Sequence, residues 1–151
     1  MAEKSYKMKE ERGKETEAIL AVLEKFCNSL QRRDLDALQS LMHEEIVFIP
    51  HDTDLLFGCK EVCQYYYEML QKLTSLLMNF KDVKIKISFP YAWVAGRWEA
   101  EGKIRRQVYN LKGHFRAQEE NHARTEGRFS AIFQKEEKGW VMLHGHSSVS
   151  I

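Results

Sequence analysis

In the first part of the chain, apolar residues return every three or four positions, which is the period of an amphipathic helix. The clearest apolar stripe begins after Lys14 and consists of Ile19, Leu23, Phe26 and Leu30. Residues 1–13 are polar and lack such a stripe. They are therefore predicted to form a flexible N-terminus ahead of one domain over residues 14–151, a length that suits a single core.

Two further helices and a short strand follow. Asp34 has the side chain of an N-cap and predicts a short second helix. The β-branched and aromatic run over residues 45–50 ends at Pro50 and predicts an edge strand. Gly58 precedes a third helix, on which Tyr66 belongs to the apolar face.

After Asn79 the period changes to two, which predicts strands. The expected strands cover residues 83–89, 91–101, 127–134 and 140–148. Residues 102–125 show no clean period and are long for a hairpin connection, so they are compatible with a lid, an extended pair of strand ends or a flap that contacts a partner. Helices followed by hairpin-linked strands indicate the α+β class: a cone-shaped, curved antiparallel sheet with three N-terminal helices around a cavity.

The last expected strand carries the most informative pattern. Side chains alternate between the faces of a strand. Strict alternation places an aromatic ring, a thioether, two imidazoles and a hydroxyl on one face: Trp140, Met142, His144, His146 and Ser148. Such a face suits the wall of a pocket, and it is predicted to point into the cavity.

Composition narrows the class of partner. The chain is 44% hydrophobic and 30% charged, with a net charge of +1. This near balance argues against a nucleic-acid-binding module. No apolar run is long enough to span a membrane, and the first residues lack the apolar core of a signal peptide, so a cytoplasmic protein without a membrane partner is expected. Cys27, Cys59 and Cys63 are expected to be reduced thiols.

Three stretches resemble a known family. They are the junction at residues 33–38, the run from Pro50 to Gly58 with the helix start that follows, and the ending W-x-x-x-H-x-H-x-S at residues 140–148. In this order they resemble the NTF2-like superfamily, in its SnoaL-like and ketosteroid-isomerase-like branch, and the ending is similar to the association domain of calcium/calmodulin-dependent kinase. The resemblance implies a cystatin-like cone over residues 14–150. Ketosteroid isomerases have an aspartate as general base just before the proline of the first strand, whereas Ile49 stands there in this chain.

The residue types themselves suggest seven ligand-binding candidates. Imidazoles bind ligands or transfer protons near neutral pH, guanidinium groups hold carboxylates, and aromatic rings supply apolar contact. The candidates are His144, His146, Arg97, Arg128, Trp93, Tyr66 and His51. For the histidines and arginines a purely structural role is equally open, through hydrogen bonds or ion pairs across the sheet. No catalytic residue is assigned, and no metal site or cofactor is expected.

Two functions remain open from the sequence. The first is a SnoaL-like protein that binds a small, partly apolar, anionic or carbonyl-bearing ligand in the cone, with cofactor-free isomerase- or hydratase-like acid/base chemistry. The second is a non-catalytic oligomerisation or scaffold module. In either case a homodimer is expected through the exposed face of the sheet, because neither face of residues 91–101 is purely polar.

Overall fold

The computed structural model describes the backbone of residues 2–150, and the side chains of that range apart from those of 2–11, 107–108 and 116–119. The elements are α1 (Ala2–Gln31), α2 (Leu35–Ser40), β1 (Met42–Ile49), β2 (Leu56–Phe57), α3 (Gly58–Gln71), β3 (Leu73–Ser88), β4 (Tyr91–Tyr109), β5 (Phe115–Glu136) and β6 (Gly139–Val149).

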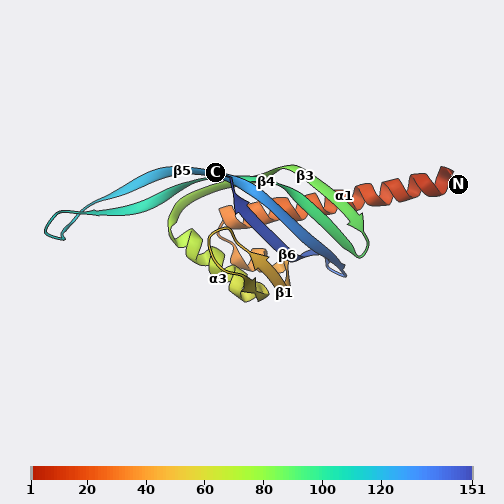
Figure 1. The fold of residues 1–151 in the computed structure, drawn as a ribbon, viewed down its shortest axis with the longest axis horizontal. Coiled ribbons are helices and arrows are strands. Elements are labelled where there is room, and N and C mark those ends of the chain that lie inside the picture. The colour runs from red at the N-terminus through yellow and green to blue at the C-terminus, as the bar shows by residue number, and fades with distance from the viewer. Residues whose placement is uncertain (1, 151) are drawn as a thin grey trace.

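The strands form one curved, open sheet in the order β2-β1-β6-β5-β4-β3. All neighbours are antiparallel except β1 and β6, which pair in parallel. Figure 1 shows α1 and α3 on the same side of this sheet, so that its concave inner face is covered and its outer face is not. The predicted α+β cone is confirmed. The strand β1 is not an edge, because β2 pairs with its far side.

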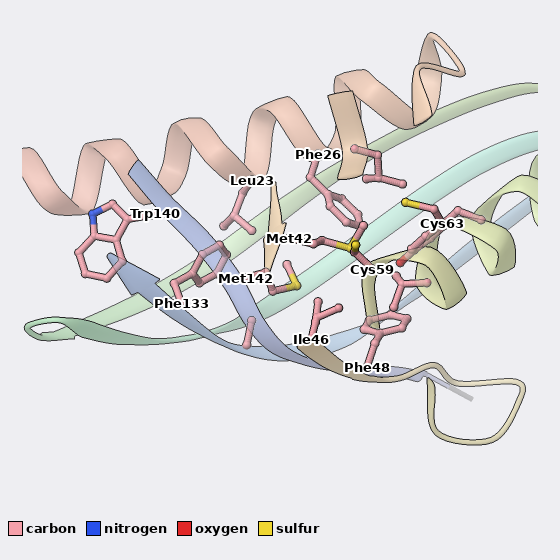
Figure 2. Packing of buried hydrophobic residues seen from close by; sticks show 14 of the residues in the cluster. Leu23, Phe26, Met42, Ile46, Phe48, Cys59, Cys63, Phe133, Trp140 and Met142 are labelled. Atoms are coloured by element: carbon pink, nitrogen blue, oxygen red, sulfur yellow. The ribbon is translucent and has the colours of Figure 1, made fainter. Parts of the chain in front are cut away.

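The core lies between the helices and the inner face of the sheet. Leu23 and Phe26 of α1 point toward the sheet, and Cys59 and Cys63 of α3 approach from the side (Figure 2). Alternate residues of the strands supply the floor, including Phe133, which is fully buried. Burial of each large apolar side chain stabilises the fold by roughly 1.5–3 kcal/mol, so this layer dominates the stability.

The junction between α1 and α2 is held by two polar residues. Arg33 adopts a positive φ of 60° and donates hydrogen bonds from Nη1 to the Leu70 carbonyl at 2.7 Å and from Nη2 to the Leu73 carbonyl at 2.5 Å. Asp34 caps α2 by accepting from the Ala37 amide at 3.0 Å, as predicted. The pair thereby ties the helical corner to the end of α3.

Trp140 anchors α1 on the hairpin between β5 and β6. Its indole N–H donates to Glu15, whose carboxylate also lies 3.2 Å from the Lys135 ammonium. Lys135 sits 5.6 Å from the centre of the Trp140 ring, at cation–π distance. The first residue of the predicted pocket face is therefore a contact between helix and sheet.

Several boundaries differ from the sequence analysis. α1 begins at Ala2 rather than Lys14, because the Glu- and Lys-rich start has high helix propensity even without an apolar stripe. β3 begins at Leu73, before the change of period after Asn79. Of the three alternatives for residues 102–125, the structure shows the extended pair of strand ends.

The closing strand breaks its own alternation. Ile132 pairs with His144, whereas the next residue, Phe133, pairs with Met142, so Leu143 is an extra residue in β6. Such a β-bulge shifts the side chains that follow to the opposite face. The prediction that Met142 and His144 share one face is therefore wrong.

Gly127 makes a glycine-specific approach between β4 and β6. A Cβ at this position would lie 1.9 Å from the Ser148 carbonyl oxygen and 2.7 Å from the Trp98 ring. We expect Gly127→Ala to lower the free energy of unfolding by about 3 kcal/mol, measured by urea denaturation. Gly13→Ala is the control, because a Cβ there meets nothing within 4 Å and the helix should gain about 1 kcal/mol. Equal stability of the two variants would contradict this packing.

Candidate functional site

A cavity of about 120 Å³ lies between the helices and the inner face of the sheet. α1, α3, β1 and β3–β6 all contribute to its wall. Seven aromatic rings line it: Phe26, Phe48, Tyr65, Tyr66, Phe80, Trp98 and Phe129. Its surface is almost entirely apolar, which is the usual character of a small-molecule site.

The rings contact one another edge to face or at a tilt. Tyr66 meets Phe26 at 5.6 Å and Tyr65 at 5.1 Å between ring centres, both nearly perpendicular. Phe80 and Phe129 of the sheet lie 4.6 Å apart. Aromatic pairs of this geometry add about 0.5–1.5 kcal/mol beyond their burial, so the wall is a preformed surface.

Polar groups gather at one end of the cavity. The Tyr65 hydroxyl donates to Asp52 Oδ1 at 2.5 Å, and the other Asp52 oxygen lies 4.0 Å from His51 Nε2. The His51 ring in turn lies 5.9 Å from the Trp98 ring. These contacts join the loop after β1 to α3 and β4. We call His51, Asp52 and Tyr65 the mouth cluster.

Both tyrosines of α3 that line the cavity remain protonated. Burial raises the pKa of Tyr65, and its hydrogen bond to Asp52 raises it further, since the carboxylate holds the phenolic proton. Burial is also the main cause that raises the pKa of Tyr66, with smaller effects from Cys27, Asp52 and Cys63. The phenols are therefore neutral groups that can donate hydrogen bonds.

Trp98 presents a second polar atom next to the cavity. Its indole Nε1 is buried, and it has no hydrogen-bond partner among the residues that the structure describes. The ring lies over Gly127, which leaves room for it. An unpaired buried N–H is costly, and such atoms concentrate at functional sites.

The structure divides the seven predicted ligand-binding residues between the two faces. Tyr66 and His51 border the cavity. His146 is also among its lining residues, but it is exposed and pairs with Ser130, next to the inward Ala131, so its side chain shares the outer face with that of His144. His144 and Trp93 border a depression on the outer face, across the sheet. Trp93 pairs with Ile132, and Ile132 with His144, so these three side chains share the outer face.

The two predicted arginines also lie on the outer face. Arg97 is paired directly with Arg128 across β4 and β5. The Arg97 side chain is 61% exposed, and its Nε lies 4.0 Å from Asp82 Oδ2. Such an ion pair is the structural role that remained open for Arg97 from the sequence. Neither arginine borders the cavity. Three residues of the candidate site are not among the seven predicted ones: Asp52, Tyr65 and Trp98. For Asp52 and Tyr65, the only indication in the sequence was their position next to His51 and Tyr66.

The outer depression is larger, about 480 Å³, and more open. Lys84 and Lys86 stand at its border, and the Trp93 side chain is 48% exposed there. A ligand in this depression would stay largely in water, whereas typical small-molecule sites bury most of the ligand. The inner cavity is therefore the better candidate site.

All three cysteines are buried and are not in disulfides. Burial raises the pKa of the Cys27 thiol to about 12 and that of Cys63 to about 11. Because the thiolate is the reactive form, both thiols are poor nucleophiles at neutral pH. Among the described residues, no three His, Cys, Asp or Glu side chains come together in a way that could hold a metal ion.

A family model for the SnoaL-like domain matches residues 19–151. The chain belongs to the SnoaL-like family. The match includes every element that forms the cavity, from the apolar stripe of α1 to β6. The family predicted from the three short motifs is thus confirmed. No match is found among curated proteins.

Several solved structures share the fold at low sequence identity. A candidate dehydratase of the NTF2-like family from Streptomyces avermitilis is 14% identical with a TM-score of 0.74, and the match covers 92% of this chain and 99% of that one. An NTF2-like superfamily protein from Salmonella enterica is 16% identical, with a TM-score of 0.76 and coverage of 93% and 94%. A candidate calcium/calmodulin dependent protein kinase II association domain from Xanthomonas campestris is 13% identical, with a TM-score of 0.67 and coverage of 87% and 85%.

These likenesses of the SnoaL-like chain to solved structures show its fold and leave its activity open. Within residues 2–150, no helix is both long and apolar enough to cross a membrane.

The raised phenol pKa values predict how this SnoaL-like domain behaves at high pH. A folded pKa above the unfolded value of about 10 means that stability is intact below that pH and falls as the pH rises past it. Tyr66→Phe should shift the midpoint of alkaline unfolding upward, because the variant has one buried ionisable group fewer. Absorbance of tyrosinate and near-UV circular dichroism would follow the transition.

Tyr67→Phe is the matched control, since this neighbouring ring is 46% exposed and should leave the midpoint unchanged. Complete ionisation of all six tyrosines near pH 10 in the folded protein would contradict the burial of Tyr65 and Tyr66.

Proposed function

We propose that this SnoaL-like protein binds a small, uncharged molecule of about one ring, with one polar substituent, in the inner cavity. The observation that carries this is the aromatic wall of the cavity, with the hydrogen-bonded Tyr65 and Asp52 and the neighbouring His51 beside it. An apolar body would lie against Phe48, Tyr66 and Phe129, and the polar substituent would face the mouth cluster.

The size of the cavity supports a compact ligand. An engineered apolar cavity of about 150 Å³ takes up benzene. At about 120 Å³, the present cavity is of the same order. A single ring, or a chain of similar volume that extends through the mouth, fits without repacking the core.

The cavity wall favours a ligand whose polar group is uncharged. No lysine or arginine borders the cavity. A carboxylate inside it would be desolvated without a partner, which is costly. A carbonyl or hydroxyl group can instead exchange hydrogen bonds with His51 or with Tyr65, and this replaces the anionic ligand that Arg97 and Arg128 suggested from the sequence.

The mouth cluster supports acid/base chemistry without a cofactor. An imidazole such as that of His51 is a common general acid or base. Asp52 lies beside it to stabilise the imidazolium, and the protonated Tyr65 holds Asp52 in place. Isomerisation or hydration of a carbonyl compound needs only such groups. The relative named as a candidate dehydratase is consistent with that class.

Filling the cavity should abolish ligand binding. Ala100 borders the cavity, and Ala95 lies five residues earlier on β4 and borders the outer depression. We expect single-ring ketones, enones and phenols to raise the melting temperature of the wild type and of Ala95→Leu, but not of Ala100→Leu. The measurement is a thermal shift over a panel that includes the matching carboxylates.

The alternative outcomes of the ligand panel are distinct. A shift with carboxylates alone would overturn the neutral ligand. A shift that survives in Ala100→Leu but disappears in Ala95→Leu would move the site to the outer face. No shift with any compound, together with an unchanged melting temperature for His146→Ala, would leave no support for a ligand-binding function.

A second function, assembly through the outer face, is favoured by the charges there. Arg97 stands directly opposite Arg128, and Glu99 directly opposite Glu126. Like charges in directly opposite positions destabilise a sheet. Within the chain, Glu99 is held by Lys81 at 2.9 Å and Arg124 at 3.6 Å, and Arg97 lies 4.0 Å from Asp82. Two copies related by a two-fold axis between these rows would place each acidic pair over the basic pair of the partner. This supports the homodimer expected from the sequence, with or without a ligand in the cavity.

Light scattering should therefore give twice the chain mass of 17.8 kDa. Arg128→Glu should shift the molecule toward the monomer, because it puts an acidic residue over the acidic row of the partner. Lys138→Glu, in the exposed turn between β5 and β6, is the control with the same change of charge. A monomeric wild type at micromolar concentration would refute the dimer.

A further inference from the structure

The two longest strands extend well beyond the rest of the sheet. The pairing of β3 with β4 ends where Leu73 meets Ile104. Beyond it, β4 and β5 continue as a two-stranded ribbon over residues 105–120, which we call the arm. Figure 1 shows the arm projecting from the body at the end opposite to the start of α1. The arm contains residues 105–109 of β4 and 115–120 of β5. Five residues of a strand span roughly 17 Å at about 3.4 Å per residue.

The tip of the arm is a hydrogen-bonded turn. The Asn110 amide donates to the His114 carbonyl at 2.8 Å, and the Gly113 amide donates to the Asn110 carbonyl at 2.9 Å. The Asn110 side chain accepts from the amides of Lys112 and His114. Gly113 adopts a φ of 80°, which suits glycine. The turn therefore presents its side chains in a defined arrangement.

The outermost side chains of this turn are apolar. Leu111 at the apex is fully exposed, and Tyr109 and Phe115 behind it are 54% and 60% exposed. The two rings contact each other nearly perpendicularly at 6.2 Å. Exposed large apolar residues gathered at the end of a projection mark a contact surface.

Cations flank these apolar groups. Arg105, Arg106 and Lys112 are exposed. Across the ribbon, Arg105 stands directly opposite Glu120, and Arg106 stands directly opposite Glu119. Over residues 105–120 the sequence still has an excess of two cations, with four Lys or Arg against two Glu. From its tip toward the body, the arm therefore presents the aliphatic Leu111 with Lys112 beside it, then the two aromatic rings, and then the two guanidinium groups. A bilayer presents the complementary order of acyl chains, interface and charged headgroups.

A lipid surface fits this projection better than a folded partner. Stable protein interfaces bury about 800 Å² on each side with matched shapes, and a convex tip of three large side chains offers far less. A fluid bilayer adapts to a small convex tip and adds electrostatic attraction for each cation. Nucleic acid is disfavoured by the net charge of only +1 over the whole chain.

We propose that the arm places Leu111 and its flanking rings into the headgroup region of an anionic bilayer. No membrane partner was expected from the sequence because no apolar run is long enough to span a bilayer. A protein that only touches the surface of a bilayer needs no spanning segment. The proposal is independent of the ligand in the cavity, since none of the arm residues borders that cavity.

Co-sedimentation of the full chain with vesicles tests this. Wild type should bind vesicles of phosphatidylcholine with phosphatidylserine, bind phosphatidylcholine alone much less, and dissociate in high salt. Leu111→Asp should lower binding at least roughly tenfold. Arg105→Gln combined with Arg106→Gln should lower it roughly 25-fold, at about fivefold for each cation.

Leu20→Asp is the control, because it makes the same change at a 43% exposed leucine on α1 and should bind like the wild type. Circular dichroism and melting temperature verify that each variant is folded. Wild type that ignores anionic vesicles, or Leu111→Asp that binds them as well as the wild type, overturns the proposal. Leu111-dependent self-association or binding to a single-stranded oligonucleotide, without vesicle binding, overturns it in favour of another partner.

Discussion

The extra residue at Leu143 decides which side chains of β6 meet the helices. Up to Met142 the strand follows the register of Phe133, and after the bulge Gly145 takes the inward position opposite Ala131. A Cβ on Gly145 would lie 2.8 Å from the Phe48 ring, so the glycine lets that ring lie against the sheet. Phe48 then contacts both Tyr65 and Tyr66. The aromatic wall of the cavity therefore depends on one irregularity in the ladder.

The sheet separates two chemical environments. The inner face has rings and neutral donors, including Tyr65 and Tyr66, whose pKa values are raised by burial. The outer face holds Lys84, Lys86 and the directly opposed arginine and glutamate pairs. Charges on the outer face remain hydrated and can meet another molecule, whereas the same charges inside would need partners that the cavity does not contain.

Local patterns predicted most of this architecture. The stripe of α1, the Asp34 cap and the Gly58 helix start follow from rules that involve residues within a few positions of one another. The faces of the candidate residues were predicted less well. An alternation rule cannot foresee a bulge, so His144 was assigned to the face of Met142. The pairing of Asp52 with Tyr65 joins residues 13 apart across a loop, and nothing local indicates it. Arg97 and Arg128 looked like ligand groups because their face was not known.

The fold alone does not explain what this chain does, since the same cone serves unrelated functions. What distinguishes the chain is how β4 is used along its length. Arg97 points outward, Trp98 and Ala100 face the cavity, and the strand then runs beyond β3 to reach the arm. Alternation along β4 decides which face of the sheet a side chain takes, and the length of β4 decides how far the strand extends. The outer face, the cavity wall and the arm are therefore formed by different residues of one strand. Substitutions in the arm should therefore leave the cavity intact, and cavity substitutions should leave the arm intact. The two proposed activities can be tested independently, which would not hold if both depended on the mouth cluster.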